Sequence, residues 1–335
     1  MEHLDINAAV SAQALPATDD YRALRQVAGA IALDERIVVR VTGDDRVSLL
    51  HGMSSNDIKQ ASAGTIMPAL FLTEHAHLIA DFFAWVEPEA ILIEIDSALW
   101  TRARAHLEKL LVADDVEFEE LSQLAVIDIE GPRASQAVRA VAGGNAAALG
   151  EWTFLRADDV TVGNLPRFGS SAFTILAPAE KSVSILAQIT ALGEGFRAVG
   201  ADALEIIRVE NGLALTGVDT GEKTIALEAR LDRAISLRKG CYVGQETIER
   251  ATARGGMRKR LFGVRIEGPR APQSGAPVTL AGKEVGRVTS IVHSPKLGMI
   301  GLAILNQSAW DKAAALSISD PAGEIAARVS EIPFD

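Results

Sequence analysis

The hydrophobic and polar positions in the first part of the chain predict strands that are followed closely by helices. Residues 36–50, RIVVRVTGDDRVSLL, begin with a β-branched run typical of a strand, turn at Gly43 and continue into acidic residues that favour a helix N-terminus. Residues 124–138, LAVIDIEGPRASQAV, repeat this order with Gly131 in the turn. The same strand–turn–helix unit is therefore predicted twice, at an offset of 131 − 43 = 88 residues.

A second pair of segments also predicts a strand, a short turn and a long helix. They are AILIEIDSALWTRARAHLEKLL at 90–111 and AFTILAPAEKSVSILAQITAL at 172–192, and further strands are predicted at 68–72 and 77–86. Two such sets favour a duplicated split βαβ, or ferredoxin-like, arrangement. Strand–turn–helix units are also common in unrelated α/β proteins, so the pattern by itself leaves duplication and coincidence both open.

The sequence changes character after residue 258. Short β-rich segments such as LFGVRIEG and KEVGRVTSIVH alternate with glycine or proline, which favours a small antiparallel barrel or sandwich. We expect an α+β chain with more than one packing unit, because 335 residues exceed the size at which a single core stops growing. The expected parts are an N-terminal arm with a short helix around 21–30 (1–35), a first α+β unit (36–120), a second α+β unit (121–257, interleaved with the first) and a C-terminal antiparallel β-barrel (258–335).

The composition narrows the class of protein. Apolar residues make up 48% of the chain and charged residues 23%, a balance that excludes a disordered chain. Acidic residues outnumber basic ones by 44 − 33 = 11, and such a surface repels nucleic acid and anionic membranes unless a local patch reverses its sign. A single cysteine excludes an intrachain disulfide and a self-contained zinc or iron–sulfur site. With no signal-like N-terminal segment and no membrane-spanning apolar run, we expect a cytoplasmic protein without membrane contacts.

Several common catalytic motifs are missing from the sequence. It contains no GxxxxGK[ST] phosphate loop, no GxGxxG after a strand, no HExxH and no GxSxG. His75 and His77 could place two imidazoles on one strand face, but a third convincing ligand is lacking. We therefore predict a hairpin turn at these histidines rather than a metal site.

Residues 230–260 form a positive segment in an acidic chain. They contain nine Lys or Arg residues and three Asp or Glu residues, a local charge of 9 − 3 = +6. Such a segment attracts anionic ligands, and a polyglutamyl or phosphorylated ligand, an RNA backbone or an acidic partner protein would each suit it. The alternative is an ordinary solvated helix face. Direct nucleic-acid binding is not the favoured outcome, because the rest of the chain is acidic.

The only thiol, Cys241, lies inside this positive segment. It follows Lys239 and Gly240 and precedes Tyr242, and Gly244 comes three positions later. Nearby cations favour the thiolate, so an exposed Cys241 would be reactive. A lone cysteine is also often a small buried hydrophobic residue, which is the structural alternative.

Three acidic residues occupy unusual positions in apolar surroundings. Asp81 interrupts the apolar strand HLIADFFAWV, and Glu210 occupies a similar place in IRVENGLALTG, just before a glycine turn. A carboxylate in such a cleft can accept two N–H bonds from a pterin or a guanidine-like ring edge. Either acid could equally face solvent at the end of a strand, and Glu228 in IALEARLD is more ambiguous still.

The segment KGCYVGQETIER at 239–250 resembles the signature of the YgfZ family, folate-binding proteins related to the T-protein, or aminomethyltransferase, of the glycine cleavage system. The resemblance extends to VTGDDRVSLLHGMSSNDI at 41–58, to the strand that contains Asp81, to IRVENG at 207–212 and to KEVGRVTS at 283–290. The matched positions of the signature are Lys239, Gly240, Cys241, Tyr242, Gly244, Gln245, Glu246 and Arg250.

The resemblance implies a T-protein-like ring of three domains with a central pocket for tetrahydrofolate or a derivative. It assigns Asp81, Glu210, Asn56 and Tyr242 to the folate site and makes Cys241 the functional thiol, able to share an iron–sulfur cluster transiently although the chain holds no metal of its own. The implied role is maintenance of iron–sulfur enzymes, including tRNA-modifying ones, with iron–sulfur proteins or assembly factors as partners. The alternatives are a folate-dependent aminomethyltransferase or other one-carbon transferase, in which Asp81 orients the folate amine or acts as a general base, and a folate-free interaction module.

Overall fold

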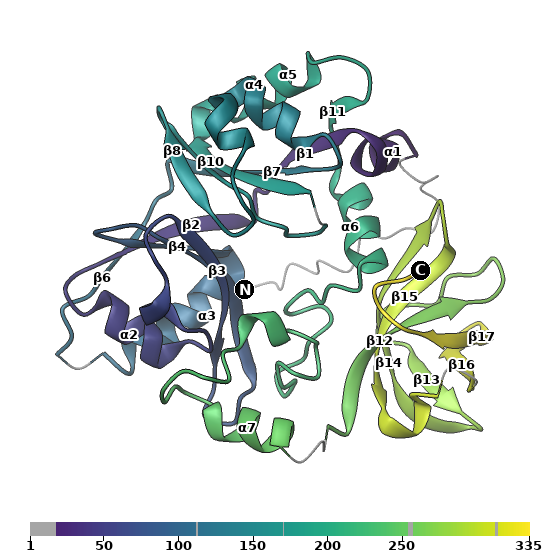
Figure 1. Cartoon of the computed structure of the whole chain (residues 1–335). Helices are drawn as coiled ribbons and strands as arrows, with labels where there is room; N and C mark the ends of the chain where they lie inside the picture. The colour runs from purple at the N-terminus through teal and green to yellow at the C-terminus, as the bar shows by residue number, and fades with distance from the viewer. Residues whose placement is uncertain (1–17, 112, 170, 254–256, 312–313) are drawn as a thin grey trace, which may run out of the picture.

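The computed structural model describes residues 18–111, 113–169, 171–253, 257–311 and 314–335, which form three bodies around a common centre (Figure 1). Two bodies are sheets covered by helices, and the third is a closed barrel. Helix α6 (Ala201–Glu210) lies between the upper sheet and the barrel. The predicted α+β class and the predicted C-terminal antiparallel barrel are both confirmed.

The first sheet has five strands in the order β3-β4-β5-β2-β6, and all neighbouring strands are antiparallel. Its two helices pack on one face, because their apolar residues join one cluster with that face. Helix α3 begins where the Asp96 side chain accepts the backbone N–H groups of Ala98 and Leu99. The elements are β2 (Arg36–Thr42), α2 (Arg46–Met53), η2 (Ile58–Gln60), β3 (Thr65–Leu72), β4 (Leu78–Val86), β5 (Ile91–Asp96), α3 (Ser97–Glu108) and β6 (Glu117–Glu120).

The second sheet has six strands in the order β11-β1-β7-β10-β9-β8. Helices α4 and α5 pack on one face and close an apolar cluster with it. The elements are β7 (Leu124–Glu130), α4 (Ala134–Ala147), β8 (Phe154–Ala157), β9 (Val160–Gly163), β10 (Ala172–Pro178), η3 (Ala179–Lys181), α5 (Ser182–Thr190) and β11 (Phe196–Ala198), together with β1 (Ala28–Ala32) from the N-terminal part of the chain.

The two sheets share one topology. In the first, β2 is parallel to β4 with β5 between them, β5 is parallel to β6 with β2 between them, and β3 is added at the edge. Strands β7, β9, β10 and β11 repeat this arrangement in the second sheet, with β8 at the edge. Gly43 and Gly131 occupy equivalent turns, with φ of 98° and 129°. The split βαβ unit is therefore duplicated.

The N-terminal helix lies earlier in the chain than predicted. Helix α1 (Thr18–Gln26) ends before residue 30, and residues 28–32 form β1 instead. Strand β1 inserts between β7 and β11, antiparallel to the first and parallel to the second. Residues 28–32, at the end of the expected N-terminal arm and helix, thus supply a strand of the second sheet, because their small side chains fit between two existing strands.

The barrel closes with the strand order β12-β15-β14-β13-β16-β17. Closure leaves no free sheet edge, which is why short strands with frequent glycines are stable here. The strands are β12 (Lys259–Ile266), β13 (Pro277–Leu280), β14 (Lys283–Ser294), β15 (Gly298–Asn306), β16 (Ala315–Asp320) and β17 (Gly323–Ser330), and the 3-10 turn η5 (Gln307–Ala309) follows β15.

The segment between α6 and the barrel packs on the first sheet, not on the second unit to which residues 121–257 were assigned. It contains η4 (Asp232–Ala234) and α7 (Gln245–Ala253). The Ser236 backbone N–H donates to Ser55 at 2.9 Å, and apolar residues of the segment share a cluster with β3 and β4. The KGCYVGQE motif therefore packs against the first unit, although it lies far from that unit in the sequence.

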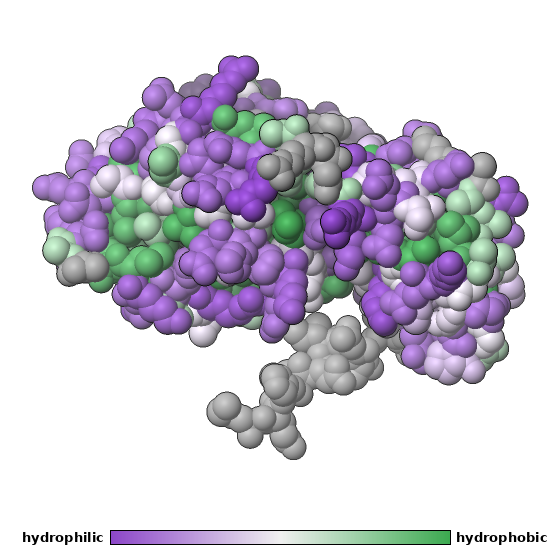
Figure 2. All heavy atoms as spheres, turned by 90° about the horizontal axis from the view of Figure 1, so that it is seen from below, coloured by the Kyte–Doolittle hydropathy of each residue, from purple (hydrophilic) through white to green (hydrophobic). Residues whose placement is uncertain are grey.

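Hydrophilic side chains dominate the face seen in Figure 2, with smaller hydrophobic areas between them. Among the described residues, none of the helices is both long enough and apolar enough to cross a bilayer. The large apolar side chains instead gather in the interior, where one cluster joins both sheets, α6 and the barrel.

Candidate functional site

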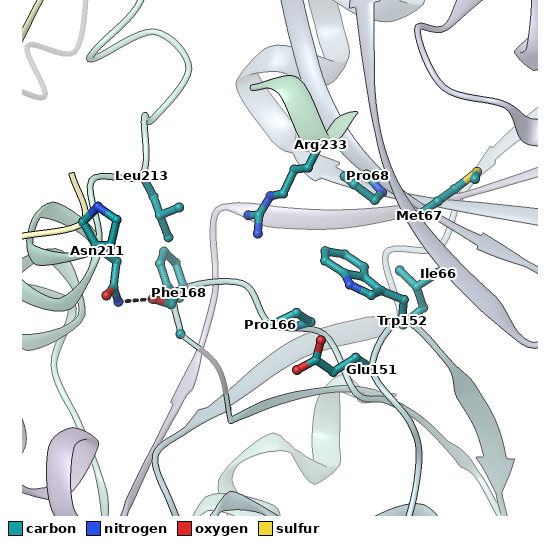
Figure 3. Close-up of a pocket in the computed structure, with 12 residues that line it drawn as sticks. Ile66, Met67, Pro68, Glu151, Trp152, Pro166, Phe168, Asn211, Leu213 and Arg233 are labelled. Atoms are coloured by element: carbon teal, nitrogen blue, oxygen red, sulfur yellow. Dashed lines mark hydrogen bonds between the residues drawn. The ribbon is translucent and has the colours of Figure 1, made fainter. Parts of the chain in front are cut away.

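A cavity of about 680 Å³ lies where the three bodies meet (Figure 3). Its volume falls within the roughly 300–1,000 Å³ of sites that bind small organic ligands. One wall comes from β3, a second from the loops on either side of β8 and β9, and a third from the chain after α6. The lining residues are Ile66, Met67, Pro68, Glu151, Trp152, Pro166, Phe168, Gly169, Asn211, Leu213, Arg233 and Pro333.

Trp152 and Arg233 lie next to one another at the cavity, with the guanidinium group over the indole ring (Figure 3). The guanidinium carbon of Arg233 lies 5.7 Å from the centroid of the Trp152 ring. Trp152 has a φ of 63°, which is costly for a bulky residue, and its backbone is held by Ile66 and Asn164 at 2.7 and 2.8 Å. Arg233 makes no ion pair within the described part of the chain. An indole ring and a cation without an ion pair among the described residues therefore share this space.

Asp81 lies on the sheet face that borders the cavity. It shares that face of β4 with Phe83 and Trp85, because alternate residues of a strand point the same way. Pro68, paired with Phe83 in the sheet, lines the cavity itself. Desolvation lowers the pKa of Arg233, and the nearby Asp81 carboxylate partly reverses that shift. Asp81 therefore lies near the cavity, although it is not among the residues that line it.

A buried group of charges lies behind the cavity wall, between the two sheets. Arg167 bonds Glu94 of the first sheet at 2.6 Å and Asp128 of the second at 3.3 Å. Arg36 also bonds Glu94 at 3.0 Å, and the Phe168 N–H donates to Glu130 at 3.0 Å. All three acids are less than 5% exposed. Three buried carboxyl groups therefore face only two guanidinium groups.

This excess of carboxyl groups shifts the pKa values of the three acids in different directions. Although burial acts to raise it, the charges of Arg167 and Arg36 hold the pKa of Glu94 below its usual value. Burial raises the pKa of Asp128 to about 6, and burial together with the Asp128 charge raises the pKa of Glu130 well above its usual value. Asp128 and Glu130 are therefore the members of this group that take up protons first as the pH falls.

Glu210 does not line the cavity. It is the last residue of helix α6, not a strand-end acid, and it is 2% exposed. Its carboxylate accepts bonds from Tyr21 at 3.0 Å, from Arg25 and from Ser294. The structure therefore shows Glu210 joining α1, α6 and the barrel, and does not bring it together with Asp81.

Lys239 of the motif is buried, and its ammonium group is bonded inside the fold rather than exposed beside the Cys241 thiol. Its ammonium group donates to the backbone carbonyls of Ser54 at 2.7 Å and Asn56 at 2.9 Å, and to that of His51. These carbonyls lie at the end of α2, where a cation is favourable. Desolvation lowers the pKa of Lys239 to about 8. The predicted cation beside Cys241 instead fastens the loop to the first unit.

Cys241 is exposed on the loop that Lys239 holds, and it is not among the residues that line the cavity. Asn56 connects the two regions, since its side-chain amide donates to Pro68 O at 2.7 Å and to Arg233 O at 3.5 Å. The alternative of a buried cysteine is thus wrong. The structure fixes the thiol at the surface and links its loop to the cavity wall.

The other motif residues shape this loop. Tyr242 is buried, its hydroxyl has no hydrogen-bond partner, and burial raises its pKa to about 12. Gly244 has a φ of 89°, and a Cβ there would lie 2.8 Å from Thr73 O, so only glycine fits against the β3–β4 hairpin. Gln245 accepts the Tyr242 N–H at 3.3 Å, whereas Gly240, Glu246 and Arg250 are exposed. Tyr242 therefore does not reach the cavity.

The HxH pair is a hairpin turn, as predicted. Thr73 N–H donates to His77 O at 2.9 Å between β3 and β4, and the two imidazole centroids are 5.9 Å apart. Among the residues the structure describes, no group of three or more His, Cys, Asp or Glu side chains is arranged to hold a metal.

Glu228 is half-buried away from the cavity and accepts the Ile225 N–H at 3.1 Å. Burial raises the pKa of Glu228.

Two family models match the chain. The GCVT N-terminal domain matches residues 11–239, and the glycine cleavage T-protein C-terminal barrel domain matches residues 259–335. The chain belongs to the glycine cleavage T-protein family. The T-protein-like fold implied by the motifs is therefore confirmed, and the narrower YgfZ assignment stays a prediction.

Relatives within the T-protein family span most of the chain. An aminomethyltransferase of Rubrobacter xylanophilus is 28% identical over 291 residues, covering 85% of this chain and 77% of the relative. A chloroplastic protein of Arabidopsis thaliana is 29% identical over 303 residues, covering 88% of this chain and 68% of the relative. The crystal structure of aminomethyltransferase T from Bartonella henselae superposes with a TM-score of 0.84 at 20% identity, covering 94% of this chain and 88% of that one. That structure shares the fold.

Proposed function

We propose that this T-protein family member binds a reduced folate in the central cavity and transfers a one-carbon unit, as a folate-dependent aminomethyltransferase or a related one-carbon transferase. The observation that carries the proposal is the cavity at the meeting point of the three bodies, where Trp152, Arg233 and the neighbouring Asp81 converge. The aminomethyltransferase relatives support the reaction class.

Each of these three residues has a role in the proposed reaction. The Trp152 ring offers a flat apolar face to the pterin or aminobenzoyl ring of a folate. Arg233, which has no ion-pair partner in the described structure, offers a cation to the negative part of the ligand. Two folate nitrogens each form a bond to the aminomethyl carbon of the donor, while the bonds from that carbon to the donor and to its amino group break. The donor and ammonia leave with the two protons that the folate nitrogens lose. Asp81 orients one of these nitrogens or accepts its proton.

Titration of the purified protein with tetrahydrofolate in a calorimeter tests the proposal. We expect saturable binding with one site, and an affinity roughly 10- to 150-fold lower in Asp81→Asn, because a charge-assisted hydrogen bond contributes roughly 1.5–3 kcal/mol. Asp114→Asn, an exposed acid remote from the cavity lining, should bind like the wild type. Incubation with an aminomethyl donor should then yield methylene-tetrahydrofolate. Absence of any binding heat contradicts the proposal.

A second function is favoured by the exposed Cys241 on its anchored loop. In this alternative the protein is a folate-binding accessory factor for iron–sulfur enzymes, and the thiol is the reactive or transiently ligating group. Replacing Cys241 by alanine should then leave stability and folate affinity unchanged while cells lose the activity of their cluster-dependent enzymes, including tRNA-modifying ones. One-carbon transfer that is insensitive to Cys241→Ala favours the transferase instead.

A further inference from the structure

The cavity wall formed by residues 166–169 has no regular secondary structure of its own. Pro166, Phe168 and Gly169 line the cavity, whereas Arg167 between them is buried, with 7% exposure. Its backbone makes one local bond, from the Arg167 N–H to Leu165 O at 2.8 Å, and no strand or helix ladder, so side-chain contacts are needed to hold the wall against the rest of the fold.

Contacts from different parts of the fold hold this wall. The Phe168 N–H donates to Glu130 of the second sheet at 3.0 Å, and Phe168 O accepts the side-chain amide of Asn211 after α6. Arg167 reaches both sheets through Glu94 and Asp128. Arg167 is the only one of these residues that is part of the wall and also bonds the first sheet through its side chain.

Contacts on several sides fix the position of the Arg167 guanidinium group. Its carbon lies 4.8 Å from the centroid of Phe83, and its charge is near enough to lower the pKa of Arg233 in the cavity. Arg36 also bonds Glu94 and the Thr174 hydroxyl also bonds Asp128, but Arg167 is the one cation that bonds both of these buried carboxylates among the described residues. A planar group with five donors suits this bridge, and an ammonium group cannot span it equally well.

We propose that Arg167 is a positioning residue, which sets the cavity wall at 166–169 by bridging Glu94 and Asp128 without touching the ligand. The expected effect on tetrahydrofolate affinity rests on the proposed folate site. The expected effect on amide exchange in the wall does not depend on that site.

Hydrogen exchange and tetrahydrofolate titration of Arg167→Lys test the inference. The control is Arg36→Lys, because the Arg36 side chain donates to the carboxylate of the same Glu94 at 3.0 Å and to its backbone carbonyl at 2.9 Å, but Arg36 belongs to β2 and not to the wall. We expect amide exchange in the 164–169 peptide to be at least tenfold faster in Arg167→Lys and unchanged in Arg36→Lys. The tetrahydrofolate Kd should rise about tenfold only in the first variant.

The possible outcomes distinguish the positioning role of Arg167 from the proposed binding of folate. Faster exchange in both variants, or in neither, overturns the positioning role, because the contacts would then contribute only to general stability. Faster exchange in Arg167→Lys alone, with an unchanged Kd in a protein that binds tetrahydrofolate, overturns the link to the ligand. If the wild type binds no tetrahydrofolate, the proposed function fails, and the exchange comparison still decides whether Arg167 sets the wall.

Discussion

Replacing Arg208 by methionine should lower the free energy of unfolding by about 3–5 kcal/mol, because it leaves a buried carboxylate without its cation. Arg208 in α6 is 3% exposed and bonds Asp219, which is 1% exposed, at 2.6 Å. It also donates to Ser290 of β14 at 2.6 Å, and Ser290 donates to Asp219 at 2.7 Å. The change therefore disrupts a polar network that joins α6 to the barrel.

An exposed ion pair provides the control for Arg208→Met. Arg40 bonds Glu119 at 3.1 Å with both side chains more than 40% exposed, so Arg40→Met should cost less than about 1 kcal/mol. Urea denaturation of both variants measures the difference as a shift of midpoint at constant slope. A loss below 1 kcal/mol for Arg208→Met would show that water replaces the missing donor and that this network does not hold the barrel in place.

The strands could be predicted because they leave periodic patterns in the sequence, whereas the repeated order of elements favoured a duplication without deciding it. Strands β2 and β7 begin at the predicted residues 36 and 124. Strand β1 was missed because AGAIA follows a helix without a break and carries only small apolar residues, which are compatible with either element. Its strand conformation depends on β7 and β11, so only the tertiary structure decides it.

The candidate site was predictable only in part. Asp81 interrupts an apolar strand, and the same signal is present in ILIEI and VIDIE, where Glu94 and Asp128 turn out to be buried. Those two acids could have been found by the same reasoning. Trp152 is a single aromatic residue in a polar loop and gives no periodic signal. The role of Lys239 depends on a contact with His51, 188 residues away, which no local pattern encodes.

Replacing Trp152 should have the largest effect on ligand affinity. Stacking on an aromatic side chain contributes roughly 1–3 kcal/mol per ring, so we expect the tetrahydrofolate Kd to rise about 10- to 100-fold in both Trp152→Ala and Trp152→Gly. The opposed Arg233 also loses the ring beneath it, at 5.7 Å. Trp310→Ala, which removes a barrel indole packed against Phe262, should reduce stability without changing the affinity.

The two replacements at Trp152 should differ in stability, although not in affinity. At a φ of 63° an alanine keeps the backbone strain of the wild type, whereas a glycine relieves it. Trp152→Gly should therefore be more stable than Trp152→Ala by about 1 kcal/mol in urea denaturation. That order, with equal loss of affinity, would show that the strained backbone serves to direct the indole into the cavity. An unchanged Kd in both variants would mean that the ligand does not stack on Trp152.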